Sequence, residues 1–199
     1  LVRALSRHEI DHVSVDAKNP GGGGDIALDL RDRAGTRAVI EGFEPDVVVH
    51  CGTHSALAYR DRLIEAFNDD AAALTSILEP LATRPACRLI YFSSSYVYSG
   101  LAAEDPVSES TKLQPSHNFG VAKSFFEQLA LRSHPSTIVF RLSSVFGPGN
   151  ALNPNAVFNM AKECLEAGTL TVWGAGLRRM QYVYMQDVLT CIGQAFTGT

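Results

Sequence analysis

The sequence predicts an α/β protein built on a doubly wound parallel sheet. Apolar segments with strand character alternate with helical segments along the chain. One of them, DVVVHC at residues 46–51, is a continuous apolar run, as expected of a strand that is buried on both faces. Regular alternation of such strands with helices is typical of a parallel sheet that helices cover on both sides.

The individual elements follow from the same patterns. Strands are expected at residues 13–16, 27–30, 46–51, 87–93 and 137–142. Helices are expected at residues 33–42, 60–83 and 123–132, and the opening LVRALSRH also has a helical pattern. Pro80 is expected to break the long helix, because proline removes a backbone hydrogen bond. Pro20 and the four glycines after it form a flexible connection rather than a linker between domains.

Composition narrows the possible functions. The 199 residues are 46% hydrophobic, which fits a globular domain with a sizeable core. The net charge of −4 offers no basic surface for nucleic acid. No apolar run reaches the length of a membrane span and no signal peptide opens the chain, so a cytoplasmic protein without a membrane partner is expected. The four cysteines lack metal-type spacing and are expected to be free thiols.

The ends of the sequence predict a chain cut from a longer protein. Leu1 enters a helical pattern with no capping residue before it. The last residues stop soon after another helical pattern begins. We expect a partial cofactor-binding domain at residues 1–150 and the start of a substrate-binding region at residues 151–199.

Two segments carry the strongest chemical signal. LIYFSSSYVYSG, residues 89–100, is an apolar strand that ends in hydroxyl side chains. NFGVAK, residues 118–123, follows Pro115 and leads into a helix. Ligands of open parallel sheets bind beyond the carboxyl ends of the strands. The serines of the first segment therefore lie where chemistry is expected.

The spacing of these segments resembles that of the extended short-chain dehydrogenase/reductases, and within them the NAD-dependent epimerase/dehydratase family of nucleotide-sugar enzymes. Two further segments share the resemblance, RLSSVFGPG at residues 141–149 and an element that runs from WGAG to YVYMQD at residues 173–187. The resemblance covers almost the whole chain. It implies a Rossmann-type sheet that here lacks its first strand and glycine-rich loop, and it implies NAD as the cofactor.

The resemblance also implies a catalytic group. Ser94 would hydrogen-bond the sugar oxygen that cycles between alcohol and ketone. Lys123 would bind the nicotinamide ribose and lower the pKa of a tyrosine that acts as general base. Phe119 occupies the position of that tyrosine and has no hydroxyl. Three explanations stay open: a natural pseudo-enzyme, a displaced acid/base, or a deliberate Tyr-to-Phe substitution. The candidates for a displaced acid/base are Tyr96, Tyr98 and His117.

Cofactor contacts are expected at the strand ends. Asp16 can accept hydrogen bonds from both adenosine ribose hydroxyls and would repel a 2′-phosphate, which favours NAD over NADP; the alternative is a simple turn aspartate. Asp29 matches a family aspartate that meets the adenine, or it caps a helix, a role for which Asp32 is better placed. Asn68 matches a helix asparagine near the nicotinamide, or it is a solvated helix residue. The remaining expected cofactor contacts are Leu30, Cys51, Gly52, Thr53, Lys123 and Leu142.

Substrate contacts are implied by the same resemblance. Met180 stands where nucleotide-sugar enzymes carry an arginine that clamps the diphosphate, so the two arginines before it are candidates for that charge or are solvated surface residues. The expected substrate contacts are Ser94, Ser95, Ser144, Arg178 and Arg179. No metal site is expected, because His50 and His54 have no carboxylate-rich motif beside them.

These features predict an NAD-dependent epimerase or 4-ketosugar reductase that acts on the C4 alcohol or ketone of a UDP- or dTDP-sugar, and a homodimer. A 4,6-dehydratase is disfavoured, because Ser94, Ser95 and Tyr96 stand where dehydratases have Thr-Asp-Glu. The alternative is a catalytically impaired dinucleotide-binding regulatory or scaffold protein, which Phe119 and Met180 both favour. RNA binding, a third possibility, has little support from the acidic charge balance.

Overall fold

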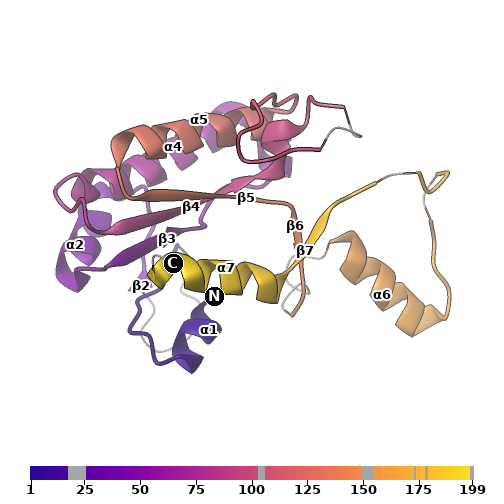
Figure 1. Ribbon diagram of the computed structural model, residues 1–199, viewed down its shortest axis with the longest axis horizontal. Helices are drawn as coiled ribbons and strands as arrows, with labels where there is room; N and C mark the ends of the chain where they lie inside the picture. The colour runs from indigo at the N-terminus through magenta and orange to yellow at the C-terminus, as the bar shows by residue number, and fades with distance from the viewer. Residues whose placement is uncertain (18–25, 103–105, 149–154, 173, 178, 198–199) are drawn as a thin grey trace. The chain divides into compact units, whose positions relative to one another are not determined.

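The structure is a computed structural model that describes residues 1–17, 26–102, 106–148, 155–172, 174–177 and 179–197. The chain forms two compact units, Leu1–Arg141 and Leu142–Thr199. Parallel strand pairs alternate with helices along it, which confirms the predicted fold class (Figure 1). Among the described helices, none is long and apolar enough to cross a membrane. The division into a cofactor domain and a substrate region at residue 150 stays a prediction.

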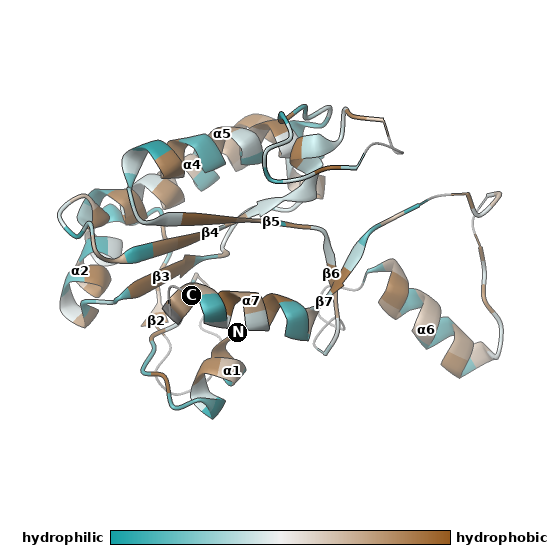
Figure 2. Ribbon diagram, viewed as in Figure 1, coloured by the Kyte–Doolittle hydropathy of each residue, from teal (hydrophilic) through white to brown (hydrophobic). Residues whose placement is uncertain are grey.

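The main sheet of the first unit has the strand order β3 (Val47–His50), β4 (Arg88–Ser94), β5 (Thr137–Leu142). β3 and β4 pair in parallel, with Val47 opposite Arg88 and His50 opposite Tyr91. Continuous apolar character along these strands places them in the interior, and Figure 2 shows them in the colours of hydrophobic residues. These strands agree with the three apolar runs predicted from the sequence.

A second ladder of the first unit joins two short strands. β1 (Val15–Asp16) pairs in parallel with β2 (Ile26–Ala27). Both strands are shorter than predicted, and the last bond between them runs from the Leu28 amide to the Asp16 carbonyl at 3.0 Å. Within the described residues, no ladder connects this pair to the main sheet.

The helices begin where side chains satisfy their free backbone N–H groups. Asp32 caps α2 (Arg33–Phe43), its carboxylate accepting from the Gly35 amide at 3.0 Å. Ser55 caps α3 (Ala56–Asp61) in the same way. α1 (Val2–Arg7) opens the chain, as its sequence pattern predicts. The helix-cap role considered for Asp29 is therefore wrong.

The long helix predicted for residues 60–83 is broken at a different place than expected. α3 ends at Asp61 and α4 (Leu63–Leu81) begins two residues later, because Arg62 has φ −140° and ψ 53°. Pro80 lies inside α4, in its last turn, and does not break it. A proline this close to the helix end interrupts little of the hydrogen-bond ladder, since the helix stops one residue later.

The core of the first unit lies between the main sheet and the helices α3, α4 and α5 (Asn118–Ser133). Its fully or almost fully buried members come from the strands and from the facing helix stripes. The largest of them are Tyr59, Leu74, Leu81, Leu89, Tyr91 and Phe126. This packing fixes α4 and α5 beside each other, which matters for the site because both helices contribute to it.

The second unit contains its own parallel pair. β6 (Ser144–Phe146) pairs with β7 (Tyr182–Tyr184), with Ser144 opposite Tyr182. Helices α6 (Ala156–Ala167) and α7 (Met185–Thr197) complete it. The Asn155 side chain caps α6 at the Phe158 amide and donates to the Val145 carbonyl, so one residue joins the helix start to β6.

Candidate active site

The end of β4 presents three serines in different environments. Ser93 is 5% exposed, and its hydroxyl has no hydrogen-bond partner among the described residues. Ser94 is half-buried and caps the 3₁₀ turn η1 (Ser95–Tyr98), its Oγ accepting from the Tyr96 amide at 3.3 Å. Ser95 is exposed. The strand therefore ends with the Ser94 hydroxyl at the boundary between core and surface, where the sequence places the substrate contact.

The start of α5 packs directly against η1. A Cβ atom at Gly120 would lie 2.3 Å from the Tyr96 carbonyl oxygen, a distance that no side chain tolerates. Backbone bonds hold the same approach, since Gly100 donates to the Gln114 carbonyl at 2.7 Å and Gln114 donates to the Val97 carbonyl at 2.9 Å. Glycine at position 120 thus lets the first turn of α5, with Phe119, lie beside the end of β4.

Lys123 lies inside the protein behind this turn. It is 3% exposed, and its Nζ donates to the Phe92 carbonyl at 2.7 Å. The ammonium also lies 5.1 Å from the centre of the Tyr91 ring and 5.7 Å from that of Phe119. Burial lowers the pKa of Lys123 to about 8, because a charged amine is poorly solvated there. The motif spacing therefore brings Lys123, Phe119 and the end of β4 together as predicted.

Aromatic rings surround the Phe119 side chain. The Tyr96 ring meets it edge to face with 5.7 Å between centres, and the Tyr59 ring lies 5.6 Å away. The Tyr59 hydroxyl is engaged, since it donates to Asp70 Oδ2 at 2.8 Å. His117 meets Tyr96 edge to face at 5.7 Å. Of the two tyrosines whose rings lie against Phe119, Tyr96 is therefore the candidate to supply a hydroxyl in place of one at position 119.

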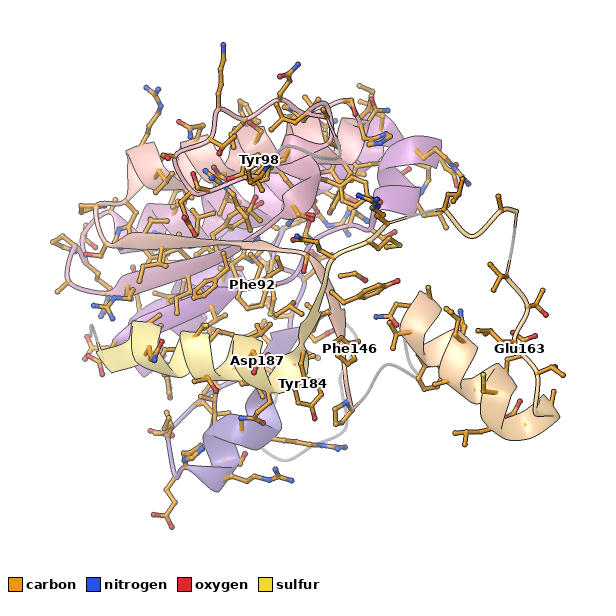
Figure 3. All side chains as sticks on the ribbon, turned by 45° about the vertical axis from the view of Figure 1, so that its right-hand side comes forward. Phe92, Tyr98, Phe146, Glu163, Tyr184 and Asp187 are labelled. Atoms are coloured by element: carbon orange, nitrogen blue, oxygen red, sulfur yellow. The ribbon has the colours of Figure 1, made fainter. Side chains whose placement is uncertain are left out.

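Tyr98, another sequence candidate for the acid/base, has a structural role. Its hydroxyl donates to the Ser108 carbonyl at 2.9 Å and accepts from the guanidinium of Arg141. Arg141 in turn pairs with the fully buried Glu127 at 2.6 Å. Figure 3 shows Tyr98 in this part of the first unit. These bonds connect the loop near residue 108 to α5 and β5. The Tyr98 hydroxyl already donates and accepts a hydrogen bond within the protein.

The loop after β3 is held by a residue that sequence reasoning missed. Asp70 of α4 is 7% exposed and accepts hydrogen bonds from Thr53 Oγ1 at 2.6 Å and from the His54 amide at 3.0 Å.

Asn68, the residue expected near the cofactor, is exposed on the same helix. A Cβ at Gly52 would meet only Leu30 Cδ1, at 3.5 Å, so two expected cofactor contacts lie together. Cys51 begins this loop.

The expected adenosine contacts lie nearby. Asp16 is exposed at the end of β1, close enough for its charge to act on the Cys51 thiol. The Asp29 carboxylate binds Arg31, with 2.6 Å between Nη2 and Oδ2, and this hydrogen-bonded guanidinium lowers the pKa of Asp29 to about 2. Arg31 also binds Asp69 at 2.8 Å. Asp29 therefore stays ionised and is already paired with a cation.

The remaining expected residues belong to the second unit and are described within it alone. Leu142 ends β5 and is half-buried, Ser144 begins β6, and Arg179 is exposed. Arg178 lies outside the described residues. Phe146 and Tyr184 lie beside each other across the β6–β7 pair, with 5.4 Å between ring centres (Figure 3). In the described part of the chain, no group of three His, Cys, Asp or Glu side chains is arranged to hold a metal ion.

A parallel sheet with a serine-ended strand and a buried helix lysine beside it defines a Rossmann-type protein of the short-chain dehydrogenase/reductase class. The profile of the NAD dependent epimerase/dehydratase family matches residues 1–198, so the chain belongs to this family. This match confirms the family resemblance that the sequence motifs indicate. The family is one of NAD-dependent enzymes.

Solved structures share the fold. UDP-glucose 4-epimerase of Thermotoga maritima, solved with UDP-glucose, aligns with a TM-score of 0.82 and 18% identity over 95% of this chain and 66% of its own. UDP-glucose 4-epimerase of Thermus thermophilus, solved with NAD, aligns with a TM-score of 0.80 and 19% identity over 98% of this chain and 69% of its own. At this identity the likeness establishes the Rossmann-type fold.

Curated relatives add two further similarities. Methionine adenosyltransferase 2 subunit beta of Xenopus laevis is 29% identical over 134 residues, which cover 65% of this chain and 38% of that protein. A probable dTDP-4,6-dihydroxy-2-methyloxan-3-one 4-ketoreductase of Streptomyces antibioticus is 28% identical over 150 residues, which cover 74% of this chain and 47% of that protein. The chain thus spans less than half the length of these two relatives.

Proposed function

We propose that this protein is an NAD-dependent enzyme that acts on the C4 alcohol or ketone of a nucleotide sugar, as an epimerase or a 4-ketosugar reductase. The observation that carries the proposal is Lys123, a buried ammonium placed by α5 behind the serine-ended strand β4. Burying a cation costs free energy unless hydrogen-bond acceptors replace the lost water. The hydroxyls of a cofactor ribose would be such acceptors.

The residues present fit NAD. The Lys123 ammonium has three N–H donors, and one of them is used on the Phe92 carbonyl. Gly52 leaves the backbone of its loop open to close approach by a ligand. Asp16 supplies a carboxylate at a strand end, where ribose hydroxyls are bound in folds of this type. When bound, NAD would take up and return a hydride from the sugar carbon.

The chain's own residues would handle the proton and the sugar oxygen. Ser94 would donate a hydrogen bond to the C4 oxygen from the end of β4. Oxidation of the alcohol sends the hydride to the cofactor and releases the hydroxyl proton, which needs an acceptor. Phe119 cannot take it, so we assign this role to the Tyr96 hydroxyl, which lies on the adjacent ring. The reverse reaction returns the proton to the ketone oxygen.

The relatives support the substrate class. One structural neighbour was solved with UDP-glucose, and one sequence relative is named a 4-ketoreductase of a dTDP-linked sugar. Ser95, Ser144, Arg178 and Arg179 stay predictions as contacts of the nucleotide-sugar substrate.

A second candidate function is regulatory dinucleotide binding without turnover. The observation in its favour is that Phe119, whose ring lies 5.7 Å from the Lys123 ammonium, carries no hydroxyl, so the family's acid/base is absent from that position. The relative named methionine adenosyltransferase 2 subunit beta is a subunit by name and matches 65% of this chain. In this function, Lys123 and Ser94 would bind the cofactor and would not take part in proton transfer.

A binding and turnover experiment separates the two candidates. Isothermal titration of the full-length protein with NAD and NADP is expected to give tighter binding of NAD, since Asp16 would repel a 2′-phosphate. Turnover of UDP-glucose and of a dTDP-4-keto sugar is then followed by NMR. Binding of NAD with measurable turnover supports the enzyme; binding without turnover, also in the Phe119→Tyr variant, supports the regulatory candidate. Failure to bind either dinucleotide contradicts both.

The homodimer also stays a prediction, and exposed apolar side chains support it. On α3, α4 and α5, four large apolar residues have half or more of their surface exposed, namely Leu57, Ile64, Val121 and Phe125. The three helices pack against one another in the first unit, so these residues belong to one helical layer. Exposed apolar groups of this kind mark interaction surfaces. Sedimentation equilibrium of the wild type and of Ile64→Lys tests the dimer.

A further inference from the structure

Asp70 is a buried carboxylate whose two oxygens are both occupied. Thr53 Oγ1 donates to Oδ2 at 2.6 Å, the Tyr59 hydroxyl donates to Oδ2 at 2.8 Å, and the His54 amide donates to Oδ1 at 3.0 Å. In the described part of the chain, no cationic side chain forms an ion pair with it. Three hydrogen bonds solvate the carboxylate, but they do not neutralise its charge.

Lys123 is the complementary case, a buried ammonium with no carboxylate bonded to it among the described residues. Glu127 lies one turn further along α5, but its carboxylate is taken by Arg141. The charge of Asp70 raises the pKa of Lys123 against the lowering by burial, and it also acts on His50 and Tyr91. Asp70 and Lys123 therefore share one poorly solvated region and balance each other through space.

Asp70 also connects this region to the loop after β3. Thr53 and His54, which it holds, follow Gly52, where the backbone is open to a ligand. Tyr59, its third partner, packs against the Phe119 ring. One carboxylate on α4 thus touches the loop expected to bind the cofactor and the aromatic group beside the catalytic position.

We propose that Asp70 is a positioning residue for the dinucleotide: it fixes the loop at Thr53 and His54, and it supplies the negative charge that keeps Lys123 an ammonium able to donate to the cofactor. This inference rests on the proposed NAD site. It assigns a function to a residue that neither the motif spacing nor the expected cofactor contacts include.

The two parts of the role can be separated by Asp70→Asn. The side-chain amide keeps a carbonyl oxygen that accepts from the His54 amide or from Thr53, but its charge is gone. Without that charge, the pKa of Lys123, already about 8, falls further and the ammonium is lost at lower pH. NAD binding by Asp70→Asn is therefore expected to weaken as the pH rises from 6 to 8, earlier than in the wild type.

Other groups that face Lys123 do not titrate in this pH range. On β3, burial lowers the pKa of His50 to about 4, so its imidazole is already neutral. The pKa of the Cys51 thiol, in the loop after β3, is raised because the atoms packed around it solvate a thiolate poorly, although part of the residue is exposed. Burial raises the pKa of Tyr91 on β4, so both groups stay protonated. Glu127 on α5 is paired with Arg141. A shift of the pH profile near neutrality therefore reports Lys123.

The matched control is Glu65→Gln. Glu65 lies in the first turn of the same helix, carries the same charge as Asp70, and pairs with Arg62 at the exposed surface. Titration calorimetry from pH 6 to 9 would measure the NAD dissociation constant of the full-length wild type and of both variants. If the Lys123 pKa falls by roughly one unit from about 8, Asp70→Asn is expected to bind NAD about fivefold more weakly at pH 8 and about tenfold more weakly at pH 9, while Glu65→Gln keeps the wild-type profile.

The titration of Lys123 itself gives an independent readout. Carbon-13 NMR of the lysine Cε in the cofactor-free protein follows the Lys123 charge directly, with Lys123→Met to assign the signal. A lower Lys123 pKa in Asp70→Asn than in the wild type supports the proposal even if the protein binds no NAD, which would contradict only the proposed function. An unchanged Lys123 titration, or an unchanged pH profile of NAD binding, overturns the inference. If Asp70→Asn does not fold, Thr53→Val tests the loop: unchanged NAD affinity in that variant overturns the positioning role.

Discussion

The ammonium of Lys123 lies 5.7 Å from the centre of the Phe119 ring. A lysine at this distance would stabilise the phenolate of a tyrosine, because its positive charge favours the ionised form. Against phenylalanine the same charge makes only a cation–π contact. The protein thus keeps the group that activates a general base while the base itself is absent from that position.

Restoring the hydroxyl is expected to improve proton transfer beyond what Tyr96 provides. We expect Phe119→Tyr to raise kcat on a UDP- or dTDP-sugar by up to about 10²-fold, the part of the usual 10²–10⁴-fold contribution of a positioned acid/base that Tyr96 does not supply. The KM should change little, since the substitution adds one oxygen at the edge of an existing ring. Steady-state kinetics of both proteins measure this. Substantial wild-type activity that Phe119→Tyr leaves unchanged would contradict the assignment of position 119.

The wild-type turnover that remains is expected to depend on Tyr96. Its ring meets Phe119 edge to face at 5.7 Å, and its backbone amide bonds Ser94. We expect Tyr96→Phe to lower kcat by about 10²-fold or more, and the double variant with Phe119→Tyr to recover it. His117→Gln serves as the control at the neighbouring ring. Equal rates in Tyr96→Phe and wild type would exclude Tyr96 as the acid/base.

Replacing Gly120 by alanine is expected to destabilise the folded protein, whereas the same change at Gly42 is not. A Cβ at position 120 would lie 2.3 Å from the Tyr96 carbonyl oxygen, so Gly120→Ala must push α5 away from η1. At Gly42 in α2 nothing lies within 4 Å of the added atom. Urea unfolding should show a loss of roughly 1–3 kcal/mol for Gly120→Ala and a gain of up to about 1 kcal/mol for Gly42→Ala. A neutral Gly120→Ala would mean that α5 does not approach η1 this closely.

The sequence predicts the elements whose signal is local. The strands at residues 46–51 and 137–142 are apolar runs, and the structure places strands there. The family motif spacing also predicts that the end of one strand meets the start of one helix. The structure brings together Ser94, Phe119 and Lys123 in this way. Asp32 is the helix cap that its position predicts. These features depend on neighbours close in sequence or on a shared family pattern.

Features that depend on distant partners could not be predicted in this way. Asp70 is buried because three donors from residues 53–59 turn toward it, and nothing in its local sequence distinguishes it from Asp69. Asn68 matches a family asparagine by its place in the pattern, and the structure leaves its side chain exposed on α4, which agrees with the alternative of a solvated helix residue. The break at Arg62 likewise reflects how α3 and α4 pack. The break predicted at Pro80 is wrong, because the sequence does not show that the helix ends only one residue after it.

The ion pair between Glu127 and Arg141 is expected to be essential for stability. Glu127 is fully buried and bonds the guanidinium at 2.6 Å, and Arg141 also contacts Tyr98. Glu127→Ala leaves a partly buried cation without its partner, which costs about 3–5 kcal/mol. Glu41→Ala, at the exposed pair with Arg37, should cost less than about 0.5 kcal/mol. Urea unfolding of both variants measures the difference, and equal losses would contradict it.

His50 is expected to make the stability of the folded protein depend on pH. It is 4% exposed, and burial together with the charge of Lys123 lowers its pKa from 6.5 to about 4. Between these values the unfolded chain binds a proton that the folded chain does not, so the free energy of unfolding falls as the pH falls from 6.5 to 4. The loss should reach about 3 kcal/mol, from roughly 1.4 kcal/mol for each unit of pKa.

Urea unfolding at pH 4.5, 5.5, 6.5 and 7.5 tests this slope in the wild type and in His50→Gln. The variant has no imidazole to protonate, so its unfolding free energy should change much less across the range. Asp29 does not confuse the result: its pKa is lowered from 3.8 to about 2 by the bonded Arg31, so its contribution is present above pH 3.8 and is lost only below the measured range. His8→Gln, at an exposed histidine of the N-terminal segment, is the control and should keep the wild-type slope. The same slope in His50→Gln would show that another group is responsible for it, and that folding does not lower the pKa of the His50 imidazole.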